Sequence, residues 1–282
     1  MIDGDGGERP CEPTVSVEVD GAPVVKEGHT RHREPLERHL GRGAARRLNL
    51  LPKVLRARGE RTTGTRVLGL DEAGRGSLVG PLVVGAFCLP EDRLDELVEL
   101  GAKDSKALSP RARERVYAGL GSLGTCRQVV LSPRTIDRAV VHGRLNELEA
   151  EAFARLVREL APDVAYVDAC DPNERRFGRK VARLAGGSRR IISRHHADRD
   201  FPVVGAASIV AKVQRDRAVA ELREELGEDL GSGYPSDERT IRFVRSSLAT
   251  RKDVPDWVRG SWATMQRVKP RRPARTLDEG EP

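Results

Sequence analysis

Apolar and polar positions follow strand-like and helix-like patterns from about residue 66 onward. Two short apolar segments, residues 67–71 and 79–89, flank a glycine-rich turn and are predicted to be strands. Residues 94–100 and 110–120 have helical spacing, and Ser109 stands where a helix cap is expected. The folded part of the chain is therefore expected to begin with two strands that are followed by helices.

The pattern then alternates between helices and strands. Leu145–Leu160 is the clearest helix, because its leucines recur at helical spacing. Residues 129–131 and 164–167 are short apolar segments that are predicted to be strands. Residues 206–226 form a second long helix in this interpretation, and residues 235–269 hold shorter helical pieces. Strands followed by alternating helices and strands are typical of a layered α/β domain.

The first 65 residues differ in composition from the rest. They lack aromatic residues; residues 1–30 carry two basic and seven acidic side chains, and residues 31–65 carry ten basic and three acidic ones. Few large apolar groups and segregated charge predict disorder, either as a functional basic arm or as a solvated extension without a role. We expect a basic extension over residues 1–65, a folded domain over residues 66–269, and a disordered tail over residues 270–282.

Composition narrows the class of protein. The 282 residues are 38% apolar, enough for a sizeable core, and the formal net charge of +7 favours an acidic polymer as partner, although a merely basic surface gives the same charge. The four cysteines form no C-x-x-C pair, which predicts reduced thiols rather than a zinc or disulfide framework. No signal peptide is evident, and the longest apolar segment contains Pro81 and is too short to span a bilayer. We expect a cytoplasmic monomer without membrane contact.

Carboxylates at the ends of predicted strands are the strongest chemical signal. Asp71 and Glu72 close the first strand, Asp168 closes the strand over residues 164–167, and Asp216 lies in the second long helix. Acids at strand ends gather at one edge of an α/β sheet, where they repel one another unless divalent cations neutralise them. Ligands that are all oxygen suit Mg²⁺ or Mn²⁺ better than Zn²⁺. Such ions support hydrolysis at phosphorus.

Each acid also has a plain structural interpretation. An aspartate after a strand is often a turn or cap residue, and Asp216 alone reads as a solvated helix acid. Adjacent residues of a regular strand point to opposite faces, so Asp71 and Glu72 face one site only if the strand bends, as Gly69 and Gly74 would permit. The stretch from His195 to Asp198 suggests a metal site, but without further Cys or His we predict a structural role.

Three polar loops are candidates for substrate contact. Gly74, Arg75 and Gly76 combine backbone N–H groups that a phosphate can approach with a planar guanidinium. Lys106 lies in a polar loop that suits phosphates, and Tyr234 lies on a glycine-rich loop from which it could stack on a sugar or base. Taken singly, each is equally compatible with an ordinary surface turn.

Together these segments resemble the ribonuclease HII family, its archaeal branch in particular, over about residues 66–269. The matching pieces occur in the family's order: residues 68–76 (LGLDEAGRG), 103–106 (KDSK), 145–150 (LNELEA), 166–168 (YVD), 206–216 (AASIVAKVQRD) and 231–237 (GSGYPSD). Each piece is weak alone, but six in the family's order are specific. The departures are Ser77, where a proline is common, and His196, where a lysine is common.

The resemblance implies an RNase H-like fold, with a mixed five-stranded sheet flanked by helices and a C-terminal helical part. It implies divalent-metal hydrolysis of RNA in RNA–DNA hybrids and incision 5′ of ribonucleotides embedded in duplex DNA. The residues that match the family's metal-binding acids are Asp71, Glu72, Asp168 and Asp216. Those that match its substrate-binding residues are Gly74, Arg75, Gly76, Lys106 and Tyr234.

Two other functions fit parts of the sequence. Another two-metal nuclease or resolvase of the same fold would need the acids but not a means of sensing a 2′-hydroxyl, which residues 74–76 and Tyr234 offer. A nucleic-acid-binding protein without activity would gain nothing from acids that repel phosphate.

Overall fold

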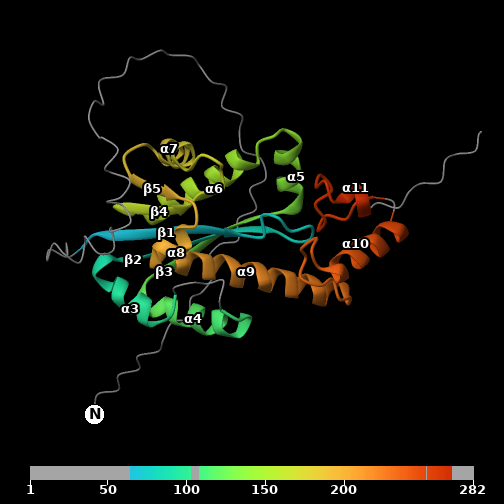
Figure 1. Ribbon diagram of the computed structural model, residues 1–282, viewed down its shortest axis with the longest axis horizontal. Coiled ribbons are helices and arrows are strands. Elements are labelled where there is room, and N and C mark those ends of the chain that lie inside the picture. The colour runs from blue at the N-terminus through green and yellow to red at the C-terminus, as the bar shows by residue number, and fades with distance from the viewer. Residues whose placement is uncertain (1–63, 103–107, 252, 269–282) are drawn as a thin grey trace, which may run out of the picture.

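The computed structural model describes residues 64–102, 108–251 and 253–268 (Figure 1). The predictions for residues 1–63, for Lys106 and for the tail over residues 270–282 lie outside the described residues. The described part is a mixed sheet covered by helices, as the resemblance predicts.

Five strands form the sheet, in the order β3-β2-β1-β4-β5. The central strand β1 pairs antiparallel with β2 and parallel with β4; β2 and β3 are antiparallel, and β4 and β5 are parallel. The strands are β1 (Arg66–Ala73), β2 (Leu82–Pro90), β3 (Thr125–Leu131), β4 (Val164–Asp168) and β5 (Arg190–Arg194).

The helices begin and end where local chemistry favours it. The Ser109 hydroxyl accepts a hydrogen bond from the Ala112 N–H at the start of α4, and Gly227 ends α9 in the left-handed conformation. The helices are the 3₁₀ turn η2 (Glu91–Arg93), α3 (Leu94–Glu99), α4 (Pro110–Leu123), α5 (Pro133–Val141), α6 (Leu145–Leu160), α7 (Glu174–Leu184), α8 (Ala197–Asp200), α9 (Pro202–Leu226), α10 (Glu238–Thr250) and α11 (Met265–Val268).

The helices cover the two faces of the sheet and one end of it. Figure 1 shows α6 and α7 on one face, α9 with α3 and α4 on the other, and α10 and α11 beyond one end of the strands. Buried side chains form a core on each face, and a third cluster joins α10, α11 and the end of α9 to Leu78 and Val79. The C-terminal helices therefore pack against the loop that follows β1.

Helix α9 lies unusually close to the sheet because glycines face it. A Cβ on Gly69 of β1 would collide with the Val203 carbonyl, and one on Gly85 of β2 would lie 2.5 Å from the Ala207 carbonyl oxygen. Side chains on α9 can therefore reach the ends of the strands.

The structure extends the sequence predictions and corrects some of them. The sequence patterns missed α5, α7 and β5, and residues 79–81 are a turn with one isolated bridge from Val79 rather than strand. Cys88 and Cys170 are free thiols, as predicted. None of the helices in the described ranges combines the length and apolar character needed to span a bilayer.

Replacing Gly69 with alanine is expected to destabilise the protein by about 2–3 kcal/mol or more, because the added methyl group forces α9 away from β1. Urea unfolding followed by circular dichroism measures the change. Gly260→Ala is the matched control, since its Cβ would meet its nearest neighbours at ordinary contact distances of 3.5 Å. Equal stability of the two variants would contradict the close packing of α9.

Candidate functional site

Three aspartates meet where the parallel strands β1 and β4 end. Leu70 pairs with Val167, so Asp71 and Asp168 follow at the same level of neighbouring strands. Asp198 joins them from α8, directly after β5. Carboxylate oxygens of these three residues all lie within 4.8 Å of one another. The edge of the sheet therefore holds an acidic cluster of the kind that the sequence predicts, with one different member.

A strained turn brings Asp198 into the cluster. His196 has φ 57° and ψ 35°, a left-handed conformation that few residues other than glycine adopt. Its backbone N–H donates a 3.0 Å hydrogen bond to Asp168 Oδ1, which ties the turn to the end of β4. Asp198 is then 1% exposed. We did not predict its position, because the sequence pattern did not reveal β5 and hence gave no strand end nearby.

Asp71 and Glu72 lie on opposite faces of the sheet. Asp71 faces α9, where the Ser208 hydroxyl hydrogen-bonds to it and the Lys212 charge is close. Glu72 faces α6 and the buried Glu149. Because both are at the sheet edge, each also feels the charge of Asp168. Adjacent strand residues point to opposite faces, but Asp71 and Glu72 lie where β1 ends, and there side chains from both faces can border one site.

The charges of these acids are poorly compensated by the protein. Burial, and next the charge of Asp168, raise the pKa of Asp71 to about 7. Burial and the charges of Asp71, Glu149 and Asp168 raise the pKa of Glu72 well above its usual range. Glu72 Oε2 is buried and has no hydrogen-bond partner among the described residues. A divalent cation fits this set of oxygen donors and would supply the missing positive charge.

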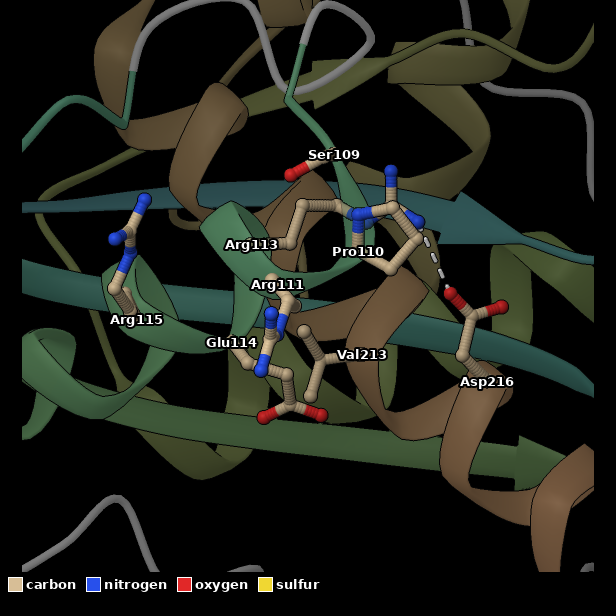
Figure 2. A pocket seen from close by; sticks show the side chains of 8 residues that line it. All are labelled: Ser109, Pro110, Arg111, Arg113, Glu114, Arg115, Val213 and Asp216. Atoms are coloured by element: carbon tan, nitrogen blue, oxygen red, sulfur yellow. Dashed lines mark hydrogen bonds and ion pairs between the residues drawn. The ribbon is translucent and has the colours of Figure 1, made fainter.

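The prediction that Asp216 belongs with these acids does not agree with its position. Asp216 lies eight residues beyond Ser208 on α9, about 12 Å further along the helix at 1.5 Å per residue. Its side chain is 44% exposed, and its carboxylate forms an ion pair with Arg113 Nη2 at 3.1 Å, which is drawn as a dashed line in Figure 2. The same face of α9 does reach the cluster, but through Ser208 and Lys212. The carboxylate that lies beside Asp71 and Asp168 is that of Asp198.

The loop over residues 74–80 borders the cluster and is held by arginines. Arg75 donates hydrogen bonds to Glu149 Oε2 at 2.8 Å, to the Cys170 carbonyl at 2.9 Å and to Asn146 Oδ1 at 2.8 Å. These contacts use three of its five N–H donors, and its side chain is 32% exposed. Arg75 therefore mainly links the loop to α6, and two of its N–H groups remain for a ligand.

Arg259 holds this loop, Arg215 holds the loop of Tyr234, and backbone hydrogen bonds join the two loops. Arg259 is fully buried and donates to the carbonyls of Arg75 and Gly80. Arg215 donates to the Ser232 carbonyl, and its guanidinium lies 4.5 Å from the centre of the Tyr234 ring. The Leu78 and Val79 N–H groups both donate to the Gly233 carbonyl. The two glycine-rich loops that the sequence singled out are thus neighbours, and one face of Tyr234 is covered by Arg215.

The two glycines beside Arg75 have different reasons to be glycine. Gly74 has φ +86°, and a Cβ there would lie 2.7 Å from the Pro81 carbonyl oxygen, so the fold requires glycine. Gly76 has no positive φ, and a Cβ would meet no atom within 4 Å. The fold would accept a side chain at Gly76, so open space there is available to a ligand. Lys106, the remaining candidate, lies outside the described residues.

Sequence comparison relates the chain to known proteins over its folded part. A family profile described as Ribonuclease HII matches residues 68–265. The chain is 43% identical over 203 residues to Ribonuclease HII of Methanocella arvoryzae, covering 72% of this chain and 91% of the relative. It is 45% identical over 202 residues to Ribonuclease HII of Methanocorpusculum labreanum, covering 72% and 93%.

Solved structures give the same relation. The ribonuclease H2 from Pyrococcus horikoshii is 36% identical with a TM-score of 0.68, over 73% of this chain and 97% of that chain. The ribonuclease HII in a PCNA complex from Archaeoglobus fulgidus is 35% identical with a TM-score of 0.67, over 73% and 98%. A ribonuclease HIII described as Bst-RNase HIII, at 21% identity and TM-score 0.62, shares the fold.

The position of Asp198 gives a direct test of the cluster. Asp198→Asn should reduce hydrolytic activity by about 10²-fold or more, because it removes a buried carboxylate beside Asp71 and Asp168. Asp216→Asn, the matched control, should retain most of the activity, since its carboxylate faces Arg113. Steady-state assays at saturating divalent metal compare the two. A dead Asp216→Asn beside an active Asp198→Asn would reverse the assignment.

The raised pKa of Asp71 predicts how stability varies with pH. A carboxyl whose folded-state pKa is raised stabilises the protein below its unfolded value of 3.8, and this stabilisation is lost as pH rises through about 7. Without metal, Tm should therefore fall over this range, and Asp71→Asn should show a shallower fall and a higher Tm at pH 8. Thermal unfolding in a chelator measures both. Parallel curves for parent and variant would show that Asp71 carries no uncompensated charge.

Proposed function

The chain belongs to the ribonuclease HII family and is an enzyme that hydrolyses the RNA strand of RNA–DNA hybrids; we propose that it also incises duplex DNA on the 5′ side of single embedded ribonucleotides. The observation that carries the proposal is the buried acidic cluster beside a loop whose Gly76 leaves open space. A site of this kind has a place for a reacting phosphate and a neighbouring place for a sugar.

Hydrolysis in this family depends on a divalent metal ion, and we assign its ligands here to Asp71, Glu72, Asp168 and Asp198. The all-carboxylate set favours Mg²⁺ or Mn²⁺. When bound, the metal activates water and stabilises the leaving oxygen. The protein's own part is to orient the carboxylates: the Ser208 hydroxyl hydrogen-bonds to Asp71, and the His196 N–H donates to Asp168.

Recognition of the ribonucleotide is assigned to the two neighbouring loops. The backbone at Gly76 is open to close approach, and N–H groups there can bind a 2′-hydroxyl or a phosphate oxygen. Arg75 and Arg259 hold this backbone in place. Tyr234 is half-buried with Arg215 over its ring, and we assign its exposed part to the adjacent sugar. The side chain of Arg75 contributes mainly by position, with its two remaining donors available to a phosphate.

The role of the residues that precede the matched family region is also a proposal. Residues 1–65 precede the match at residue 68, and the basic charge is concentrated in residues 31–65, which hold ten basic and three acidic side chains. We assign the basic part to nucleic-acid attraction rather than to catalysis, because every residue that we assign to the metal or the ribonucleotide lies within the matched family region. The relative in the PCNA complex makes a sliding clamp a candidate partner, and the enzyme is proposed to act as a monomer.

The proposal is tested on a DNA duplex with one ribonucleotide, compared with an RNA–DNA hybrid and an all-DNA duplex, with and without Mg²⁺. We expect metal-dependent cleavage of the first two only, with the single-ribonucleotide product ending 5′ of the ribonucleotide. Gly76→Ala should leave Tm unchanged, because its methyl group meets no protein atom, yet reduce cleavage of the single-ribonucleotide duplex at least 10-fold. Equal cleavage by parent and Gly76→Ala would remove the assigned role of that backbone.

A further inference from the structure

A hollow of about 740 Å³ lies between the start of α4 and the middle of α9. Figure 2 shows its lining: Arg113 of α4 reaches Asp216 of α9, while Arg115 lies apart from them. The residues are Ser109, Pro110, Arg111, Arg113, Glu114, Arg115, Val213 and Asp216. The acidic cluster at the sheet edge shares none of these residues, so the hollow is a separate feature.

The charges in this hollow do not balance. Asp216 is paired with Arg113 at 3.1 Å, and Glu114 is paired with Arg217 at 2.7 Å, so both acids are already neutralised. Arg111 and Arg115 are exposed, and within the described ranges neither has an ion pair with a carboxylate. They lie four residues apart and hence on one face of α4. Two positive charges thus line a concave surface.

The separation between the hollow and the acidic cluster follows from helix α9. Helix α9 connects the two, with Ser208 at Asp71 and Asp216 in the hollow. Eight residues of helix span about 12 Å. One strand of a duplex places successive phosphates about 3.4 Å apart along its axis, so a duplex that lies along α9 advances about three to four nucleotide steps over this span. A duplex whose cut phosphate lies at the acids could therefore present another phosphate to Arg111 and Arg115.

We propose that the hollow between α4 and α9 binds backbone phosphates of the nucleic-acid duplex through Arg111 and Arg115, three to four steps from the cut; this inference rests on the function proposed above. The contact is independent of base sequence, because guanidinium groups bind phosphate oxygens in any sequence. Arg113 positions the site by holding the Asp216 carboxylate, which would otherwise repel the phosphate. Arg217 does the same for Glu114.

The test is a charge reversal, Arg111→Glu with Arg115→Glu, in the full chain. The matched control is Arg175→Glu with Arg179→Glu, which reverses two exposed arginines on α7, on the other face of the sheet (Figure 1). Affinity for the single-ribonucleotide duplex is measured in chelator, where no cleavage occurs, at several salt concentrations. Each lost phosphate contact should lower the slope of log affinity against log salt by about 0.9.

We expect the α4 variant to lose about 10-fold or more in affinity and up to about 2 in slope, well beyond the control. With metal, its loss should fall mainly in KM rather than kcat, because the contact lies away from the reacting phosphate. Equal slopes for the two variants would overturn the proposal, as would a fall in kcat with an unchanged slope. If the parent and the α4 variant differ in slope as expected but the parent cleaves no ribonucleotide substrate, the proposed function is refuted while the phosphate contact stands.

Neutral methylphosphonates locate the contact. One is placed at each of the first six steps on either side of the ribonucleotide, and affinity is measured for the parent and the α4 variant. A step at which only the parent loses affinity marks the phosphate held by Arg111 and Arg115, expected three or four steps away. Identical profiles for the two proteins would exclude this placement.

Discussion

Mutual repulsion among buried carboxylates is the constraint on which the rest of the site depends. Asp71, Asp168 and Asp198 are brought within a few ångströms of one another, and Glu72 adds a fourth charge from the other face of the sheet. This arrangement destabilises the folded protein: the pKa values of Asp71 and Glu72 are raised, and one buried Glu72 oxygen has no hydrogen-bond partner among the described residues. A bound divalent cation would neutralise these charges, so the repulsion among the carboxylates favours metal binding, and metal binding in turn stabilises the fold.

Rigid packing holds the repelling groups together. Glycines at positions 69 and 85 let α9 approach the strands, which places Ser208 beside Asp71. The left-handed His196 turn directs the chain from β5 into α8 and donates to Asp168. Strain at one backbone position and the absence of two side chains are therefore structural requirements of the cluster rather than local accidents.

Arginines give the surroundings of the cluster their shape. Arg75 and Arg259 hold the loop after β1, and Arg215 holds the loop of Tyr234. Burial of Arg259 lowers its pKa to about 10, and its hydrogen bonds to backbone carbonyls compensate for the lost water. Further along α9, arginines outnumber acids in the hollow at α4. Helix α9 thus runs from the acidic cluster, where Ser208 contacts Asp71, to the basic hollow, where Asp216 lies.

Local patterns in the sequence were sufficient for the strands β1 and β4, the helix α6 and the acids Asp71, Glu72 and Asp168, because apolar runs ending in carboxylates are visible without contacts. They also marked the two glycine-rich loops. From the sequence we grouped Asp216, and not Asp198, with these acids, because β5 is short with polar flanks and because helix periodicity gives a face but not a position along the helix. Only the parallel pairing of β4 with β5 and the turn at His196 bring Asp198 to the cluster, while α9 carries Asp216 about 12 Å past it.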